Sequence, residues 1–180
     1  EEELALLLSS EERVGTSRLR TYLSITYANL GDVLRRMGGV KNLARAREAY
    51  VQYLQMSEEI AEESALTEDE RSVAVAYERN GDICMEAGTQ EDIKEAVRLY
   101  GLERDIWEQL KERLERLDYL RGIAIAWQKQ GTAYKELSEE GAAEQSAACI
   151  RQALSFWQQL AEESGLIQHE RDIAICYERL

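Results

Sequence analysis

The segment Tyr27-Ala-Asn-Leu-Gly31-Asp32 decides the fold, because the chain repeats it at a fixed interval. The later copies are Tyr77-Glu-Arg-Asn-Gly81-Asp82, Trp127-Gln-Lys-Gln-Gly131-Thr132 and the shorter Tyr177-Glu-Arg-Leu180, each 50 residues after the one before. Tyr50, Tyr100 and Ile150 keep the same interval, as do Ile60, Leu110 and Leu160. Repetition at a fixed period is typical of a solenoid, in which each repeat buries its apolar face against its neighbours.

Each repeat has the pattern of two helices, which we term helix A and helix B. In the second repeat, apolar or small residues recur at steps of three and four over 73–87, and a second such stripe covers 93–117. Thr67-Glu-Asp-Glu70 predicts a capping box in front of helix A, Gly88 predicts its end, and Thr89 predicts the cap of helix B. The repeat is therefore an antiparallel helix pair, with helix A of about 20 residues and helix B somewhat longer.

These boundaries predict a single array over residues 1–180. Complete repeats are expected at about 17–66, 67–116 and 117–166, between partial repeats at 1–16 and 167–180. Since both ends fall inside a repeat, we expect the chain to be a segment of a longer protein. The composition favours an all-α fold, because the chain has no proline where average usage would give about nine.

The net charge of −13 is unevenly distributed. Residues 1–50 carry eight basic and seven acidic side chains, whereas residues 51–180 carry 14 basic and 28 acidic ones. An acidic surface repels phosphate backbones, and no stretch approaches the roughly 18 apolar residues of a membrane span, so we expect neither a nucleic-acid nor a membrane partner. The one basic run is either a solvated helix end or a contact for an anion or an acidic peptide. It consists of Arg35, Arg36, Lys41, Arg45 and Arg47.

The residue types that carry chemistry do not cluster along the chain. Cys84, Cys149 and Cys176 lack CxxC spacing and are predicted to be buried free thiols, which favours a reducing compartment, the cytoplasm. His169 is the only histidine, so an HExxH zinc helix cannot form, and a surface position in the first turn of its helix is expected. We therefore expect no enzymatic activity, no metal and no cofactor.

The repeated residues resemble the tetratricopeptide repeat family. The family's helix A has an aromatic residue, then an apolar residue and glycine three and four positions later, and a large residue after three more. The matching positions are Tyr27, Leu30, Gly31 and Leu34, then Tyr77, Asn80, Gly81 and Cys84, and finally Trp127, Gln130, Gly131 and Tyr134. In helix B, Ala46/Tyr50 and Ala96/Tyr100 match the family's small and aromatic pair. Asn80, Gln130 and the pair Ser146/Ile150 depart from the pattern.

The usual repeat of this family has 34 residues, so the chain looks like a long-unit variant with taller hairpins. It is similar to long-unit arrays whose helix A opens as in Arg171-Asp172-Ile-Ala-Ile-Cys-Tyr177, which resemble sensor or scaffold regions of larger bacterial proteins. The resemblance implies a right-handed α-solenoid of stacked hairpins. Glycine would let helix A and helix B approach closely, and the aromatic would fill the wedge between neighbouring hairpins.

The family's concave wall is lined by helix A, so the resemblance implies a groove that binds a peptide or a partner domain. Its residues would be Asp32, Arg35 and Arg36 from the first repeat, Glu78, Asp82 and Met85 from the second, and Gln128, Thr132 and Lys135 from the third. The mixed charge suits an extended peptide or an amphipathic helix, and the alternative is a merely solvated groove. Ala28 and Asp32 stand where the family's carboxylate clamp has Lys and Asn, which disfavours a chaperone-tail receptor.

A protein–protein interaction module is the leading functional hypothesis. The alternative is a structural role, in which the array self-associates or spaces other domains. Ile173, Ile175 and Tyr177 would then form a contact surface, giving a homo-oligomer through exposed repeat ends.

Overall fold

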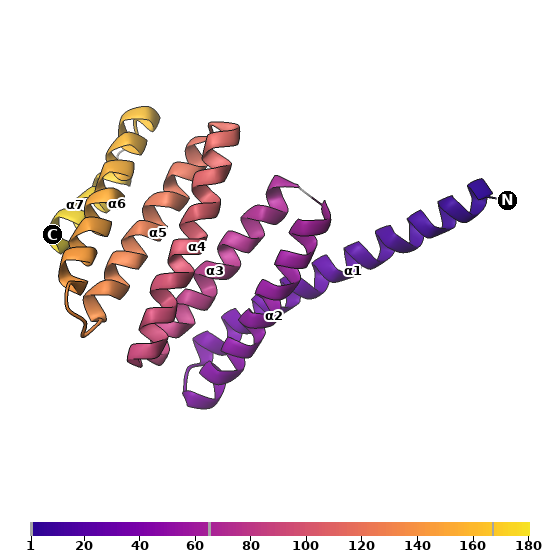
Figure 1. Cartoon of the computed structure of the whole chain (residues 1–180), viewed down its shortest axis with the longest axis horizontal. Helices are drawn as coiled ribbons and strands as arrows, with labels where there is room; N and C mark the ends of the chain where they lie inside the picture. The colour runs from indigo at the N-terminus through magenta and orange to yellow at the C-terminus, as the bar shows by residue number, and fades with distance from the viewer. Residues whose placement is uncertain (1, 65, 167) are drawn as a thin grey trace. The chain divides into compact units, whose positions relative to one another are not determined.

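A computed structural model describes the backbone of residues 2–64, 66–166 and 168–180, and the side chains of 18–64, 66–166 and 169–180. All regular secondary structure in these residues is helical, which confirms the expected all-α class (Figure 1). The helices are α1 (Glu2–Met37), α2 (Val40–Ser64), α3 (Thr67–Ala87), α4 (Gln90–Leu114), α5 (Leu117–Glu136), α6 (Ala142–Ser164) and α7 (Gln168–Arg179). None of the described helices is long and apolar enough to cross a membrane.

Helices that follow one another in the chain also pack against one another, as in an α-solenoid. α1 packs on α2, α4 on α5, α5 on α6 and α6 on α7, and α3 meets α4 in a shared apolar cluster. The helix A lengths of 21 residues in α3 and 20 in α5 agree with the prediction. So do the longer B helices, with 25 residues in α2 and α4 and 23 in α6.

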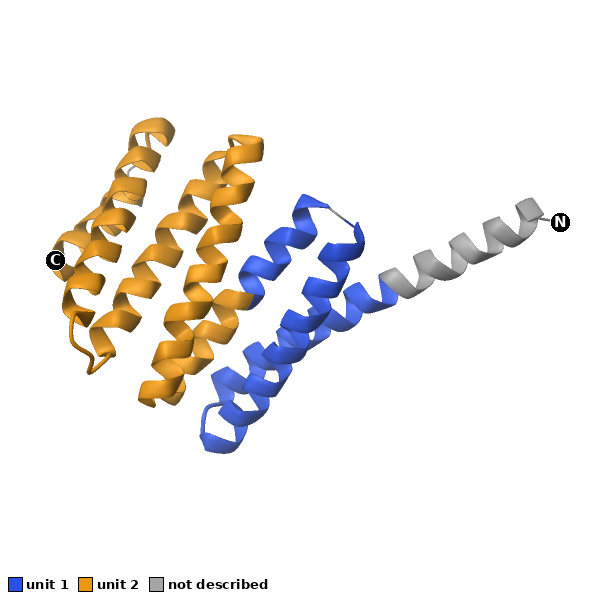
Figure 2. Cartoon of the chain, viewed as in Figure 1, with its two compact units in different colours: residues 1–76 blue, residues 77–180 orange. Residues whose placement is uncertain are grey.

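The chain divides into two compact units, Glu1–Ala76 and Tyr77–Leu180, with the boundary inside α3 (Figure 2). The partial repeat expected at 1–16 falls in the first part of α1, whose side chains lie outside the described residues. Residue 167, the first of the partial repeat expected at 167–180, also lies outside them.

The in-phase aromatics occupy equivalent places in the core. Tyr27 packs on a cluster that includes Tyr53 of α2 and Ala76 of α3. Tyr77 packs on a cluster of α3, α4 and α5 residues, and Trp127 on one of α5, α6 and α7 residues. Each aromatic therefore contacts an apolar cluster built from its own hairpin and the helix A that follows, as the repeat period predicts.

The repeated glycines allow helix A and helix B to touch. A Cβ at Gly81 would lie 2.6 Å from the Cε1 atom of Tyr100, closer than any real contact. Gly31 faces Tyr50 in the same way, and a Cβ at Gly131 would lie 2.8 Å from Ile150 Cδ1. Since these helices have helical φ values at the three positions, glycine is required by the close approach and not by backbone conformation.

The helix ends follow the sequence signals with one correction. Gly88 has a φ of +72° and ends α3, and Thr89 caps α4 by accepting a hydrogen bond of 3.1 Å from the Asp92 amide. The capping box predicted from Thr67 was wrong, because Thr67 is already the first residue of α3. The Leu66 carbonyl instead accepts from the Glu70 amide at 3.2 Å.

Candidate functional site

Two aspartates predicted for the groove hold helix A onto helix B. The pairs are Asp32 with the Tyr50 hydroxyl at 2.7 Å and Asp82 with the Tyr100 hydroxyl at 2.8 Å, and the hydroxyl donates in each. The third repeat has Thr132 and Ile150 at these positions, so the aspartate is lost where the tyrosine hydroxyl is lost. This pattern gives the aspartates a structural role within each hairpin.

Lys129 of α5 links three helices at the same face. Its ammonium lies 2.7 Å from a carboxylate oxygen of Glu78 and 2.6 Å from one of Asp82, both on α3. It also lies 5.7 Å from the ring centroid of Tyr100 on α4. Burial acts to lower the pKa of Lys129, but the attraction to Glu78 and Asp82 outweighs it and the pKa is raised. Glu78 and Asp82, both predicted groove residues, are therefore the anions of a partly buried ion pair.

Glu103 is a buried carboxyl beside this ion pair. Its side chain is 2% exposed, and one oxygen accepts a hydrogen bond of 3.3 Å from the Trp107 indole. Burial, followed by repulsion from Glu78, raises the pKa of Glu103 well above its ordinary value, against the attraction of Lys129. The folded protein thus favours a protonated, neutral Glu103.

We expect Glu103→Gln to stabilise the chain more at pH 8 than at pH 5. A carboxyl group whose pKa is higher in the folded state than in the unfolded state binds more protons in the folded state. The free energy of unfolding therefore falls as the pH rises from the unfolded pKa through the folded one. Glutamine keeps an acceptor for Trp107 and has no charge, so it removes this dependence. Melting curves followed by circular dichroism should show an advantage in Tm about 2–4 °C larger at pH 8. An equal effect at both pH values would contradict this account.

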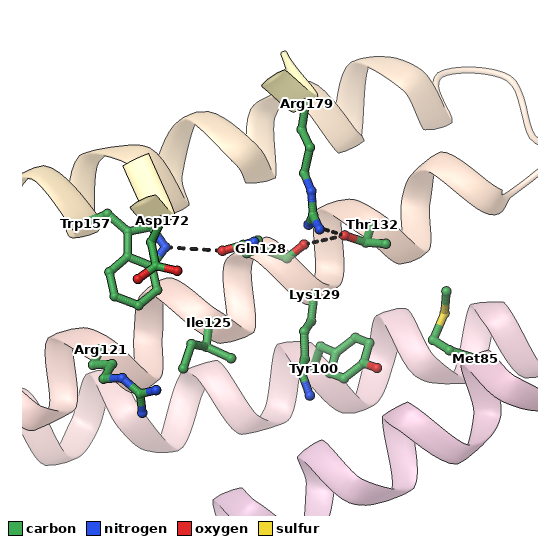
Figure 3. A pocket seen from close by; sticks show the side chains of 10 residues that line it. All are labelled: Met85, Tyr100, Arg121, Ile125, Gln128, Lys129, Thr132, Trp157, Asp172 and Arg179. Atoms are coloured by element: carbon green, nitrogen blue, oxygen red, sulfur yellow. Dashed lines mark hydrogen bonds between the residues drawn. The ribbon is translucent and has the colours of Figure 1, made fainter. Parts of the chain in front are cut away.

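A pocket of about 430 Å³ opens next to Lys129, entirely within the second compact unit (Figure 3). Its walls come from five helices, and α5 supplies half of the lining. The lining residues are Met85 of α3, Tyr100 of α4, Arg121, Ile125, Gln128, Lys129 and Thr132 of α5, Trp157 of α6, and Asp172 and Arg179 of α7. The pocket thus lies along helix A of the third repeat, between helix A residues of its two neighbours.

Hydrogen bonds between helices fix the side chains of this pocket. Trp157 is 1% exposed, and its indole donates to the Gln128 side chain at 3.2 Å. Arg179 reaches from α7 and donates to the Thr132 hydroxyl at 2.9 Å, and that hydroxyl donates to the Gln128 carbonyl (Figure 3). Both ends of the pocket combine apolar and polar groups. Trp157 and Ile125 lie near Arg121 and Asp172 at one end, and Met85 and Tyr100 lie near Thr132 and Arg179 at the other (Figure 3).

The charge of the lining contrasts with that of the chain. Three lining side chains are basic and Asp172 is the one acidic member, whereas acidic residues outnumber basic ones in the whole sequence. Lys129 is already paired with Glu78 and Asp82, so the other basic groups of the lining are those of Arg121 and Arg179. An arrangement of this kind can bind a polar, partly anionic group beside an apolar one.

The structure brings together some of the predicted groove residues. Met85, Gln128 and Thr132 line the pocket, and Glu78 and Asp82 lie behind it, bonded to Lys129. Lys135 is exposed outside the lining. The other three, Asp32, half-buried Arg35 and exposed Arg36, belong to the first compact unit, where the Arg36 guanidinium donates to the Asp32 carbonyl at 3.2 Å.

The prediction missed most of the lining, although a sequence signal for part of it exists. Lys129 and Arg179 are 50 residues apart, and each bonds to a residue 47 positions earlier, Asp82 or Thr132. A basic residue that recurs every 50 residues, and that bonds to a polar residue 47 positions earlier, therefore marks a contact between one A helix and the next. Ile125 and Arg121 occupy the same α5 face as Gln128, about one and two turns away respectively, and helical spacing would have found them.

Two predictions about single residues have different outcomes. The three cysteines are buried and free, as expected. The surface position predicted for His169 was wrong: its side chain is 5% exposed and stacks on Trp157 with ring centroids 5.8 Å apart. The imidazole thus belongs to the core contact between α6 and α7.

The departure from the repeat pattern at Gln130 has a local explanation. Gln130 is 8% exposed, and its amide nitrogen donates to the Val97 carbonyl of α4 at 3.0 Å. Its oxygen accepts from Arg104 at 3.2 Å, while Arg104 covers the Trp127 ring at 4.3 Å. A Cβ at Gly101 would come within 3.1 Å of the Gln130 amide, so glycine on α4 makes room for the polar side chain. The buried amide is therefore fully compatible with the core.

Comparison with known proteins gives the fold. The chain matches no protein-family model, and a search of curated proteins finds no match. A de novo designed helical repeat protein, DHR64, is similar with a TM-score of 0.57 at 16% identity, over 91% of this chain and 81% of that one. A chain of the DHF79 filament is similar with a TM-score of 0.51 at 16% identity, over 94% and 87% of the two chains. The protein therefore has a helical repeat fold.

Proposed function

We propose that the chain is a non-catalytic interaction module of the tetratricopeptide type, which binds a peptide segment of a partner protein on its helix A face. The observation that carries this proposal is the pocket of about 430 Å³, whose lining combines helix A residues of α3, α5 and α7. Pockets of this volume are typical of ligand sites.

The shape of the lining suits an extended segment. Arg121 and Thr132 are eleven positions apart on α5, about 16 Å along the helix axis, which is the length of about five extended residues. A bulky apolar side chain would meet Trp157 and Ile125. Gln128 and Thr132 offer hydrogen-bonding groups for the peptide backbone, and Arg121 and Arg179 would meet carboxylates.

The surroundings of the potential nucleophiles support binding over catalysis. Cys149 and Cys176 are buried, and burial raises the pKa of both thiols, to about 11 for Cys149. A thiol in this state is mostly protonated at neutral pH and a poor nucleophile. The single imidazole, that of His169, is enclosed in the core against Trp157.

Selection from a random peptide display library on the whole chain tests the proposal. We expect enriched peptides to bind in a fluorescence anisotropy titration and to lose at least about tenfold in affinity with Arg121→Glu, because an arginine that pairs with a ligand carboxylate would be reversed in sign. Arg151→Glu on α6 makes the same charge change at an exposed site outside the pocket, and its affinity should stay unchanged. Failure to enrich any peptide, or equal losses in the two variants, would rule out the pocket as a peptide site.

Self-association is the second candidate function. Tyr177 is 59% exposed, whereas Ile173 packs on the core and Ile175 is half-buried, so of the expected three-residue surface only Tyr177 is exposed. One chain with a similar fold is solved as a filament. Sedimentation of the chain and its Tyr177→Glu variant separates the candidates, because only self-association predicts a mass that rises with concentration and falls with the substitution.

A further inference from the structure

The cation that α5 adds to the helix A face is surrounded by acidic side chains of earlier helices. Lys129 lies 2.7 Å from a carboxylate oxygen of Glu78 and 2.6 Å from one of Asp82, both on α3. Its attraction also reaches Glu103, the buried carboxyl of α4. All three acidic residues precede Lys129 in the chain and lie with it in the second compact unit. The charge of Lys129 is therefore compensated from within the chain.

Arg179 is the equivalent cation one period later, and the acidic residues around that position are replaced by neutral ones. The residues in phase with the three acidic ones are Gln128, Thr132 and Ala153. The guanidinium of Arg179 keeps the bond to the residue 47 positions earlier and donates to the Thr132 hydroxyl at 2.9 Å. That hydroxyl is neutral, whereas the acceptor of Lys129 is a carboxylate. Because the three positions precede Arg179, the comparison is complete within the described residues.

The acidic residue of the pocket lining lies away from the Arg179 side chain. Asp172 comes two helical turns before Arg179 on α7, and it lies at the end of the pocket that it shares with Arg121 (Figure 3). None of the described residues that line the other end with Arg179 is acidic; they are Met85, Tyr100 and Thr132. Arg121 thus has an acidic neighbour in the lining, whereas Arg179 has neutral ones.

We propose that the Arg179 end of the pocket is a carboxylate subsite, where an Asp or Glu side chain of the bound peptide pairs with Arg179 as Asp82 pairs with Lys129. The inference rests on the proposed peptide binding and adds the identity of one peptide residue. Arginine binds carboxylates through short, charge-assisted hydrogen bonds, which are about twice as strong as neutral ones. Arg179 is therefore the residue that distinguishes acidic peptides from neutral ones.

Gln128 can add a second hydrogen bond to the same carboxylate. Its side-chain oxygen accepts from the Trp157 indole at 3.2 Å, which leaves the amide nitrogen to donate to a ligand. The Thr132 hydroxyl already donates to the Gln128 carbonyl, so its part is to accept from Arg179 and hold the guanidinium in place. The peptide carboxylate would therefore lie between one donor of α5 and one of α7.

The apolar residues of the lining define a second feature of the peptide. The place for a bulky apolar side chain is at Trp157 and Ile125, at the end of the pocket away from Arg179 (Figure 3). Ile125 and Thr132 are seven positions apart on α5, about 10 Å along the helix axis, which is the length of about three extended residues. The ligand class is therefore a peptide whose acidic residue stands about three positions from a bulky apolar one.

A pair of variants tests the subsite without a ligand. Thr132→Asp supplies the carboxylate that the second repeat has at Asp82, and Thr132→Asn is the control of the same size without the charge. In melting curves, Thr132→Asp should have a Tm about 2–4 °C above that of Thr132→Asn, and adding Arg179→Gln should abolish the difference. An added carboxylate is otherwise unfavourable in a chain of net charge −13, so a gain identifies Arg179 as its partner. Equal Tm values would overturn the proposal.

Peptides selected from the display library on the whole chain, and synthesised with a C-terminal amide, test the ligand. Exchange of one acidic residue for its amide should weaken binding at least about tenfold in fluorescence anisotropy. Arg179→Gln should remove this preference for the acid, whereas Arg151→Gln, at the exposed site outside the pocket, should keep it.

The outcomes separate this inference from the proposed function. Peptides that bind the pocket equally well with and without the acid would overturn the carboxylate subsite and leave the proposed function standing. Binding that requires a free C-terminal carboxylate would also overturn the subsite, because the acid would then not be a side chain. Failure to select any peptide would overturn both.

Discussion

Gly81→Ala is expected to lower the Tm of the chain by about 3–8 °C, although alanine is the better helix former. The new Cβ would lie 2.6 Å from the ring of Tyr100, which is 2% exposed and held by Asp82. The ring cannot move away without breaking that hydrogen bond and the packing around it. Overpacking of this kind costs about 1–3 kcal/mol, more than the roughly 1 kcal/mol gained in helix propensity.

Gly101→Ala is the matched control for this prediction. Gly101 is also buried inside a helix, but its Cβ would approach only the Gln130 amide, at 3.1 Å. The end of a side chain can shift by a few tenths of an ångström, so the variant should melt within about 2 °C of the unmodified chain or above it. If Gly81→Ala melted as high as Gly101→Ala, close contact between helix A and helix B would not be the reason for the repeated glycine.

Lys129→Met is expected to destabilise the chain by about 2–4 kcal/mol at pH 7. It removes the cation between Glu78 and Asp82, whose side chains are 29% and 19% exposed, and leaves two carboxylates side by side. The pKa of Lys129 is raised in the folded state. The stabilisation by the native pair is therefore fully present below the pKa of the unfolded state, and it is lost only as the pH rises through the pKa of the folded state. At pH 7 the native pair therefore contributes in full.

The loss should come from the two carboxylates of Glu78 and Asp82, which the ammonium no longer separates. Urea unfolding at pH 7 measures it. Lys94→Met is the control: its pair with Glu139 is about half exposed on both sides, and its removal should cost at most about 1 kcal/mol. Adding Glu78→Gln and Asp82→Asn to Lys129→Met should recover part of the stability. A triple variant that is no more stable than Lys129→Met would indicate that only packing was removed.

The sequence predicts the fold well because the fold depends on a repeated local pattern. The positions of Gly88 and Thr89 follow from spacing alone, as does the packing of the in-phase aromatics against apolar clusters, since the same residues must satisfy the same contacts in every repeat. Thr67 is an exception. The Leu66 carbonyl starts the hydrogen-bonding pattern of α3, and a threonine near a helix start does not by itself reveal which residue is the cap.

The candidate site is less predictable because it lies where the repeats differ. Asp82 matches the groove position of the family, but in the fold it accepts hydrogen bonds from the Tyr100 hydroxyl and the Lys129 ammonium. In the third repeat Ile150 has no hydroxyl that could donate a hydrogen bond to the position equivalent to Asp82. That position is Thr132, which lines the pocket instead. The aspartate and the tyrosine hydroxyl are lost together in the third repeat, so the change concerns a pair of residues. A comparison with the family pattern one position at a time does not detect it.

His169 shows a different limit. A histidine in the first turn of a polar-looking helix gives no sign of burial, and the ring of Trp157 that covers it comes from the preceding helix. Sequence periodicity assigns a face to a residue on its own helix. It does not say how far a large neighbouring side chain extends over the end of that helix.

The offset of 47 residues in the bonds from Lys129 to Asp82 and from Arg179 to Thr132 has a consequence for how the gene can change length. Loss of residues 83–132 in one event would bring Arg179 to the same offset from Asp82 and replace a lysine–aspartate bond by an arginine–aspartate bond. A duplication of 50 residues would likewise create a new donor together with its acceptor. Unequal recombination can therefore shorten or lengthen the protein without leaving a buried charge unmatched, provided that the change is a whole number of periods.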